Sequence, residues 1–153
     1  MEKTRIERAI EYITKLFQGN GDGHDLSHSL RVYKNAMLIA KAEGQGEEEV
    51  IALSALLHDC DDHKLFHTEN NANARSFLQE EGLSEERIEE ICKNINSVSF
   101  SKNRGKVPET IEGKIVQDAD RLEAIGAIGI ARCFQFGGSH GRSLENSIEH
   151  FYE

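Results

Sequence analysis

The stretch IALSALLHDCDDHK, residues 51–64, decides the fold class of this 153-residue chain. Its first seven residues, Ile51 to Leu57, are all apolar except Ser54. Such a run is far shorter than the roughly 18 apolar residues of a membrane span, and glutamates at 47–49 precede it, as the dipole at a helix N-terminus favours. We therefore predict a buried helix over residues 47–58, followed by a polar connection over residues 59–68.

The flanking sequence also has the 3.6-residue spacing of apolar positions that is typical of helices. Residues 25–42 carry so broad an apolar surface that they predict a central helix. Pro108 is placed in the first turn of a later helix, which continues or restarts near Gly126, and Ser84 is the predicted N-cap of another. The remaining helices are expected at residues 2–18, about 70–80, 84–95, up to about 136, and 143–152. Loops are expected at residues 96–107 and 137–142, and no convincing period-two pattern indicates a strand.

Composition describes a soluble globular protein with few helix breakers. Apolar residues make up 38% and charged residues 29%, with a single proline. The net charge of −9 repels nucleic-acid backbone and anionic lipid, so large nucleic acids and membranes are excluded as expected partners. A small phosphorylated substrate is still compatible with this negative charge, because a bound cation can make the electrostatic field positive at its own site.

We expect one domain over residues 1–153, because no linker, repeat or low-complexity segment divides the chain. The last residues still have the apolar spacing of an amphipathic helix, and no helix-terminating residue follows them. We therefore expect that the chain is truncated at its C-terminus. Three dispersed cysteines without a CxxC pair predict reduced thiols, and no targeting segment is visible, so the cytoplasm is the expected compartment.

Histidine and aspartate side chains fall on apolar faces of the predicted helices. His28 shares a helical face with Val32, and His58 shares one with Ala55. Asp59 follows His58 directly, and a buried carboxylate needs a cationic or hydrogen-bonding partner. A single interior histidine is more often a hydrogen-bonded core residue, so each of these residues alone decides nothing.

A third predicted helix brings in Asp118 or Asp120, and periodicity does not separate the two. Two imidazoles and carboxylates converging within a helical bundle suit a divalent ion. The mixed nitrogen and oxygen set without a thiolate favours Mn²⁺, Fe²⁺, Co²⁺ or Mg²⁺ over a structural zinc. From pattern alone, a metal site and an ordinary polar core both stay open.

The order of these residues resembles the H…HD…D signature of the HD-domain superfamily of metal-dependent phosphohydrolases. The resemblance runs from about residue 20 to 145. It rests on GHDLSHSLRVYKNAMLIA (23–40), IALSALLHDCDDHK (51–64) and KIVQDADRLEAIGAIGIAR (114–132), and the last of these, with GGSHGR (137–142), is similar to a bacterial subgroup of small HD hydrolases. It implies an all-α, compact orthogonal helical bundle of the HD type with about six to eight helices.

The resemblance also implies roles for individual residues. The four implied metal ligands are His28, His58, Asp59 and Asp120. Asp118 is then expected to support a ligand or hold a water. Asp62, three positions after the HD aspartate, is expected to assist the attacking water, although the family more often has glutamate there. Cys60 and Asp61 stand where the family commonly has an apolar residue and glycine, so the local loop shape is expected to differ.

The implied function is hydrolysis of a phosphoanhydride or phosphoester in a small nucleotide-like substrate. Some members of the subgroup are nucleoside triphosphate pyrophosphohydrolases, and this reaction is favoured over 5′-nucleotidase action. One divalent ion is expected, Mn²⁺ first, with Mg²⁺, Co²⁺, Fe²⁺ or Ni²⁺ as alternatives. Phosphate-binding candidates are His24, Lys64, Arg121 and Arg142, with Lys102, Arg104 and His140 behind them.

Two other readings stay open. The first is a non-catalytic HD domain that senses a metal or a nucleotide; metal binding without turnover would favour it. The second is a two-iron HD oxygenase, for which Asp62, His63 or Asp118 would supply further ligands. The sequence fixes neither the base, the sugar nor the oligomeric state, with a homodimer as one alternative.

Overall fold

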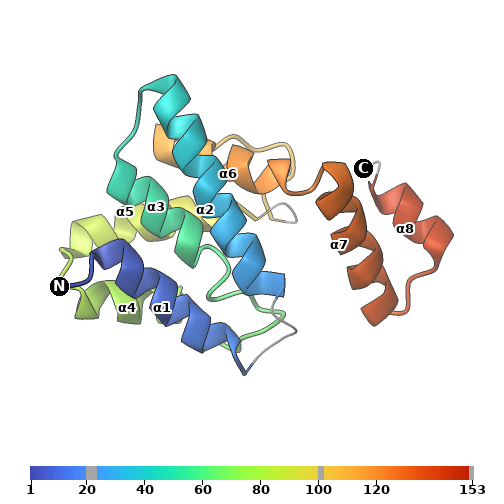
Figure 1. The fold of residues 1–153 in the computed structure, drawn as a ribbon, viewed down its shortest axis with the longest axis horizontal. Coiled ribbons are helices and arrows are strands. Elements are labelled where there is room, and N and C mark those ends of the chain that lie inside the picture. Colours follow the sequence, from blue (N-terminus) through green and yellow to red (C-terminus); the bar gives the residue numbers. More distant parts are fainter. Residues whose placement is uncertain (20–23, 100–101, 152–153) are drawn as a thin grey trace. The chain divides into compact units, whose positions relative to one another are not determined.

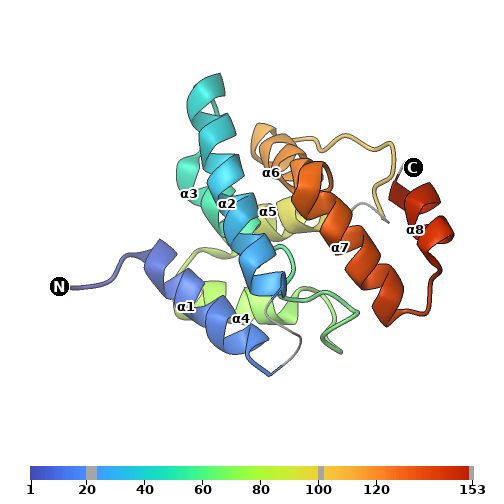
Figure 2. The same ribbon diagram turned by 45° about the vertical axis from the view of Figure 1, so that its right-hand side comes forward.

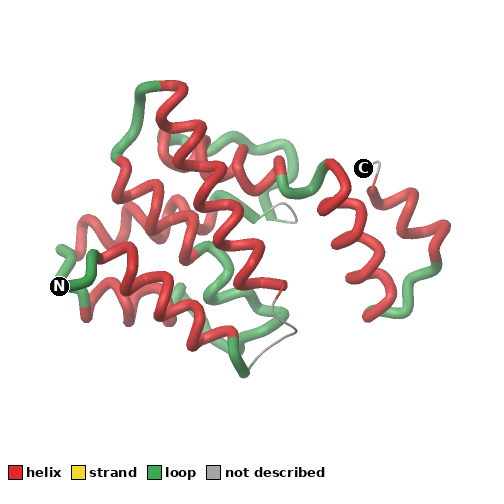
Figure 3. The backbone as a smooth tube through the Cα atoms, viewed as in Figure 1, coloured by secondary structure: helices red, strands yellow, loops and turns green. Residues whose placement is uncertain are grey.

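A computed structural model of the chain describes residues 1–19, 24–99 and 102–151; for residues 24, 25, 126–129, 132 and 151 it describes the backbone only. Eight helices and no strand occur in this part of the chain, so the predicted all-α class is confirmed (Figure 3). They are α1 (Arg5–Phe17), α2 (His24–Glu43), α3 (Glu48–Leu57), α4 (Ala72–Glu80), α5 (Glu85–Asn96), α6 (Ile111–Leu122), α7 (Gly126–Ser139) and α8 (Leu144–Phe151). None of the described helices has the length and apolar character that a membrane crossing requires.

The chain divides into two compact units, residues 1–119 and 120–153, and the boundary falls inside α6. In the first unit α3 is the central helix, because Val50 to Leu57 are all buried. It packs against α1, α2 and α5 (Figures 1 and 2). The prediction of residues 25–42 as the central helix was therefore wrong: α2 buries one face, while Leu38 on its other face is 66% exposed.

Two apolar clusters surround α3. The first contains residues of α1, α4 and α5, among them Ile13, Phe77 and Ile91. The second joins α2 and α3 to α6 through residues such as Val32 and Val116. Because α3 contributes to both clusters, its C-terminal end is held from several directions.

Capping residues account for several helix boundaries. Thr4 and Glu7 form a capping box at α1, and the Oγ of Ser84 accepts the amide of Arg87 at α5, as predicted. Helix α4 begins at Ala72, two residues later than expected, because Asn70 and Asn71 have φ values of 54° and 56°. These left-handed conformations are incompatible with a right-handed helix.

The start of α6 also differs from the prediction. Pro108 precedes the helix, and Thr110 takes the capping position, with its Oγ1 accepting the Gly113 amide at 3.0 Å. The same hydroxyl donates to Asn94 Oδ1 at 2.7 Å, which ties α6 to α5. Gly113 is required at this junction, because a Cβ there would lie 2.9 Å from Pro108 Cβ and 3.2 Å from Asn94 Oδ1.

The second unit contains the antiparallel pair α7 and α8. Residues 137–139, which were predicted as part of a loop, instead complete α7. Gly137 allows α8 to approach closely, because a Cβ there would overlap Ser147 Oγ. The helix ends with Gly141 at φ +72° and with the Arg142 amide donating to the Gly137 carbonyl at 2.7 Å, a common helix-terminating arrangement.

Two of the three free cysteines lie in the first apolar cluster. Cys60 and Cys92 are 0% and 1% exposed. Burial raises the pKa of Cys60 well above its ordinary value and that of Cys92 to about 11. Both side chains are therefore neutral thiols near neutral pH.

Substitution Gly113→Ala is expected to lower the free energy of unfolding by about 1–2 kcal/mol, because the added methyl is overpacked against Pro108, Thr110 and Asn94. An open helical site would show the opposite sign, since alanine is favoured over glycine by about 1 kcal/mol. Urea unfolding measures the difference. Gly19→Ala, with nothing within 4 Å of its Cβ, is the control and should be near neutral; equal effects at both positions would contradict the packing explanation.

Raising the pH above 9 is expected to destabilise the fold through Cys92. Its pKa is 9.0 when unfolded and about 11 when folded, so the folded chain holds the proton more tightly. The stabilisation that results is fully present below pH 9 and is lost as the pH rises toward 11. The loss in the free energy of unfolding is about 1 kcal/mol at pH 10. Urea unfolding at pH 7–10 should show a steeper loss in wild type than in Cys92→Ala; parallel pH profiles would refute this origin.

Candidate metal centre

His28 lies in the second turn of α2 and is 3% exposed. Its position follows from the helical repeat of four, because Val32, Ala36 and Ala40 are the buried residues on the same face. The three apolar residues pack in the second cluster against α3 and α6. Packing of α2 therefore brings this imidazole into the interior, as its pattern predicted.

His58 is the residue that follows α3, and its side chain is only 4% exposed. Its Nδ1 lies 2.7 Å from the Ala55 carbonyl oxygen. A carbonyl can only accept, so Nδ1 carries the proton and Nε2 keeps its lone pair. Metal-binding histidines are commonly fixed in this way by a hydrogen bond from the second ring nitrogen.

Asp59 approaches both imidazoles. Its Oδ2 lies 3.3 Å from His58 Nε2 and 3.8 Å from His28 Nε2. The two rings meet edge to face, with centroids 5.3 Å apart. One oxygen of the Asp59 carboxylate thus lies near an imidazole nitrogen of α2 and near an imidazole nitrogen of the residue that follows α3.

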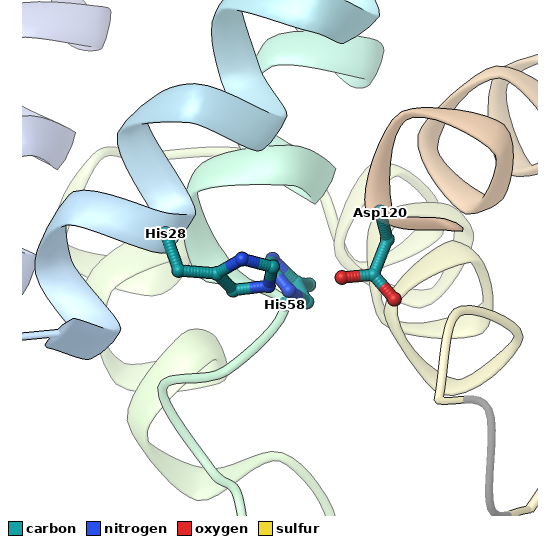
Figure 4. A group of neighbouring side chains, drawn as sticks. All are labelled: His28, His58 and Asp120. Carbon is teal, nitrogen blue, oxygen red and sulfur yellow. The ribbon is translucent and has the colours of Figure 1, made fainter. Parts of the chain in front are cut away.

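Asp120 completes the group from α6. Ile115, Val116 and Ala119 of this helix are buried in the second cluster, and Asp120 continues the same helix. One ligand atom each from His28, His58 and Asp120 lies within 4.8 Å of the others, and Figure 4 shows the three side chains pointing toward one another. Nitrogen and carboxylate oxygen atoms at such separations suit a divalent cation.

Asp118 does not belong to this group. It is exposed, and two residues along a helix correspond to a rotation of about 200° from Asp120. The structure therefore separates two aspartates that periodicity left equivalent. The expectation that Asp118 supports a ligand finds no contact in the described residues.

The polar connection after Asp59 carries the predicted catalytic residue. Asp62 is half-buried, and its Oδ1 accepts the Lys64 amide at 3.0 Å and lies 3.7 Å from His63 Nδ1. The Asp62 carbonyl also accepts the amides of Leu65 and Phe66, at 3.0 and 2.9 Å. This closed turn fixes the backbone of Asp62 and leaves the Lys64 side chain exposed.

The other predicted phosphate-binding residues differ in their exposure and contacts. The side chain of His24 lies outside the described part of the chain, and Arg121 is half-buried in α6. Arg142 donates to Ser147 Oγ at 3.1 Å and to the Cys133 carbonyl at 3.0 Å, so it stabilises the pair α7 and α8. His140 stacks on Phe136 with centroids 3.9 Å apart. Lys102 and Arg104 are exposed.

Two further groups could be mistaken for ligands. Cys60 is a buried neutral thiol that donates to Asp61 Oδ2 at 3.6 Å, so it supplies no thiolate. Glu47, Glu90 and Glu112 also lie close together, but Arg87 bonds to Glu47 and Glu90, at 2.6 and 3.1 Å. An arginine therefore already neutralises part of that acidic surface.

Sequence reasoning missed the role of Asp61, which was noted only as a departure from the usual glycine. Its carboxylate accepts amide hydrogen bonds from the first turn of α4. No signal in the sequence indicated this role, because Asn71 is of a type that commonly caps helices, and only the structure shows that it gives α4 no side-chain cap.

Comparison with known proteins agrees with the geometry. The model of the HD domain matches residues 25–125. YpgQ of Bacillus subtilis is 34% identical over 160 residues, which cover 99% of this chain and 77% of that protein.

Solved structures give the same answer for the fold. The crystal structure of YpgQ has a TM-score of 0.79 and 30% identity, covering 97% of this chain and 74% of that chain. YpgQ in complex with ADP has a TM-score of 0.77 and 31% identity, covering 97% and 75%. An HD-superfamily hydrolase from Bacillus thuringiensis has a TM-score of 0.75 and 35% identity, covering 97% and 79%.

The stretch that matches the HD domain model contains His28, His58, Asp59 and Asp120. HD domains bind divalent metals, and this chain has an HD-superfamily hydrolase fold with a His/Asp cluster able to hold one. The chain therefore belongs to the HD domain family.

Proposed function

We propose that the chain is a divalent-metal-dependent phosphohydrolase that acts on a nucleotide, with release of pyrophosphate from a nucleoside triphosphate as the favoured reaction. The observation that carries the proposal is the approach of ligand atoms of His28, His58 and Asp120 to within 4.8 Å of one another. Relatives named as HD-superfamily hydrolases and the ADP complex of YpgQ support the reaction class and the nucleotide. Three free cysteines are in keeping with a cytoplasmic enzyme.

Four residues are assigned to the cation: His28, His58, Asp59 and Asp120. Mn²⁺ is the ion that we propose first, and imidazole and carboxylate together suit borderline and hard divalent metals in general. The Nδ1–H of His58, fixed on the Ala55 carbonyl, presents Nε2 as a lone-pair donor. When bound, the cation would lower the pKa of a water and polarise a phosphoryl oxygen.

Asp62 is assigned to the attacking water. Its Oδ1 already accepts the Lys64 amide, so Oδ2 is the atom we assign as proton acceptor. The water oxygen would form the new bond to phosphorus, the phosphoanhydride P–O bond would break, and the proton would pass to Asp62. We assign the exposed side chain of Lys64, two residues away, to attraction of the substrate phosphates in an otherwise acidic chain.

The first test is product release from a panel of nucleoside mono-, di- and triphosphates with Mn²⁺. We expect pyrophosphate from a triphosphate, loss of turnover on chelation, and a loss of about a hundredfold or more in Asp59→Ala. Orthophosphate as the only product would replace the favoured reaction with phosphatase action. Metal-loaded wild type without turnover on the panel would reject the enzyme in favour of a metal- or nucleotide-sensing domain.

The second test separates the two aspartates of α6. Asp120→Asn is expected to weaken Mn²⁺ binding by about tenfold or more in calorimetry, because it removes a carboxylate from the cluster. Asp118→Asn is the matched control, with the same chemistry on the exposed face of the same helix, and should bind as wild type does. A loss confined to Asp118→Asn would reverse the assignment.

A further inference from the structure

The N-terminus of α4 lacks the capping group that its own sequence would normally provide. The preceding residue, Asn71, is left-handed and gives no side-chain cap. Its amide group instead donates to Asn96 Oδ1 at 2.9 Å. The amides of the second and third helical residues, Asn73 and Ala74, are those that a capping side chain ordinarily satisfies.

Asp61 satisfies both amides from a distant part of the sequence. Its Oδ1 accepts the Asn73 amide at 2.8 Å, and its Oδ2 accepts the Ala74 amide at 3.0 Å. The carboxylate also faces the positive end of the helix dipole. Asp61 therefore caps α4, although it lies ten residues before Asn71, the ordinary capping position.

Further hydrogen bonds fix the same segment on both sides. Thr68 donates its hydroxyl to Asp61 Oδ1 at 2.6 Å, which closes the connection upon itself. Asn73 donates its side-chain amide to the Cys60 carbonyl at 2.8 Å. On the far side, the hydroxyl of Tyr12 in α1 donates to the Asn73 carbonyl at 2.9 Å.

We propose that Asp61 is a positioning residue, which anchors the segment 59–68 to the first turn of α4 and thereby sets the carboxylates of Asp59 and Asp62. Asp62 follows Asp61 directly and Asp59 lies two residues before it, so movement at Asp61 reaches both through the backbone. For the metal and catalytic roles of those neighbours, this inference rests on the proposed function. The hydrogen bonds by which Asp61 caps α4 are independent of the proposed function.

Asp61 is an unusual kind of cap because its loss affects two places. An ordinary N-cap, such as Ser84 of α5, holds only the helix that it begins. Loss of Asp61 would free α4 and would also free the backbone next to the HD pair. Outer partners of metal ligands typically contribute about 10–100-fold to metal affinity, which sets the expected size.

The test compares Asp61→Ala and Asp61→Asn with Ser84→Ala in the full chain. Ser84→Ala is the matched control, since it removes one capping side chain from a neighbouring helix without touching the segment 59–68. Two quantities are measured: hydrogen exchange of residues 59–68 without metal, and the dissociation constant for Mn²⁺ by calorimetry. The melting temperature of each variant shows that it is folded.

Asp61→Ala is expected to accelerate exchange in residues 59–68 and to raise the Mn²⁺ dissociation constant about tenfold or more. Asp61→Asn keeps one acceptor oxygen, so it should recover part of both effects. Ser84→Ala should lower the melting temperature with Mn²⁺ affinity within about twofold of wild type.

Exchange in 59–68 that is the same in Asp61→Ala and Ser84→Ala would overturn the anchoring role. Faster exchange with unchanged Mn²⁺ affinity would overturn the link to the ligands. Wild type that binds no Mn²⁺ would be a failure of the proposed function, and the exchange comparison would still decide whether Asp61 anchors the segment.

Discussion

The burial of α3 is the constraint on which the rest of the structure depends. All residues from Val50 to Leu57 are removed from water, and this helix contributes to both apolar clusters. The chain must leave such a helix through polar residues, because unsatisfied backbone groups are costly in an apolar interior. His58 and Asp59 are these residues, so two of the proposed metal ligands lie where the buried helix ends.

The polar segment after α3 gains its order from the surrounding helices. Asp61 bonds to the amides of α4, and Asn73 of α4 bonds back to the Cys60 carbonyl. On the other side, α2 and α6 bring His28 and Asp120 to His58 through their shared packing in the second cluster. Helices thus hold His28 and Asp120, and such support favours a reproducible geometry at the proposed site.

The sequence predicted the features that depend on local periodicity. The spacing of apolar residues indicated the helices, and it also indicated that His28 and His58 are buried, because each lies one helical turn from an apolar residue. Resemblance to the HD family indicated the choice of Asp120 over Asp118, which periodicity could not make. In the structure Asp118 is exposed, whereas Asp120 lies close to His28 and His58.

Features that depend on contacts between distant residues were not predictable. The delayed start of α4 follows from left-handed Asn70 and Asn71, and its cap comes from Asp61. The hydrogen bonds of Arg142 to Ser147 and to the Cys133 carbonyl are also of this kind. In both cases a polar side chain had more than one chemically reasonable partner, and only tertiary packing selected between them.

The most direct test of the central claim is an anomalous-scattering measurement on crystals of the full chain grown with Mn²⁺. The account predicts a strong peak enclosed by the imidazoles of His28 and His58 and the carboxylates of Asp59 and Asp120. A peak at Glu47, Glu90 and Glu112 instead, or no peak between the two histidines at saturating Mn²⁺, would contradict it.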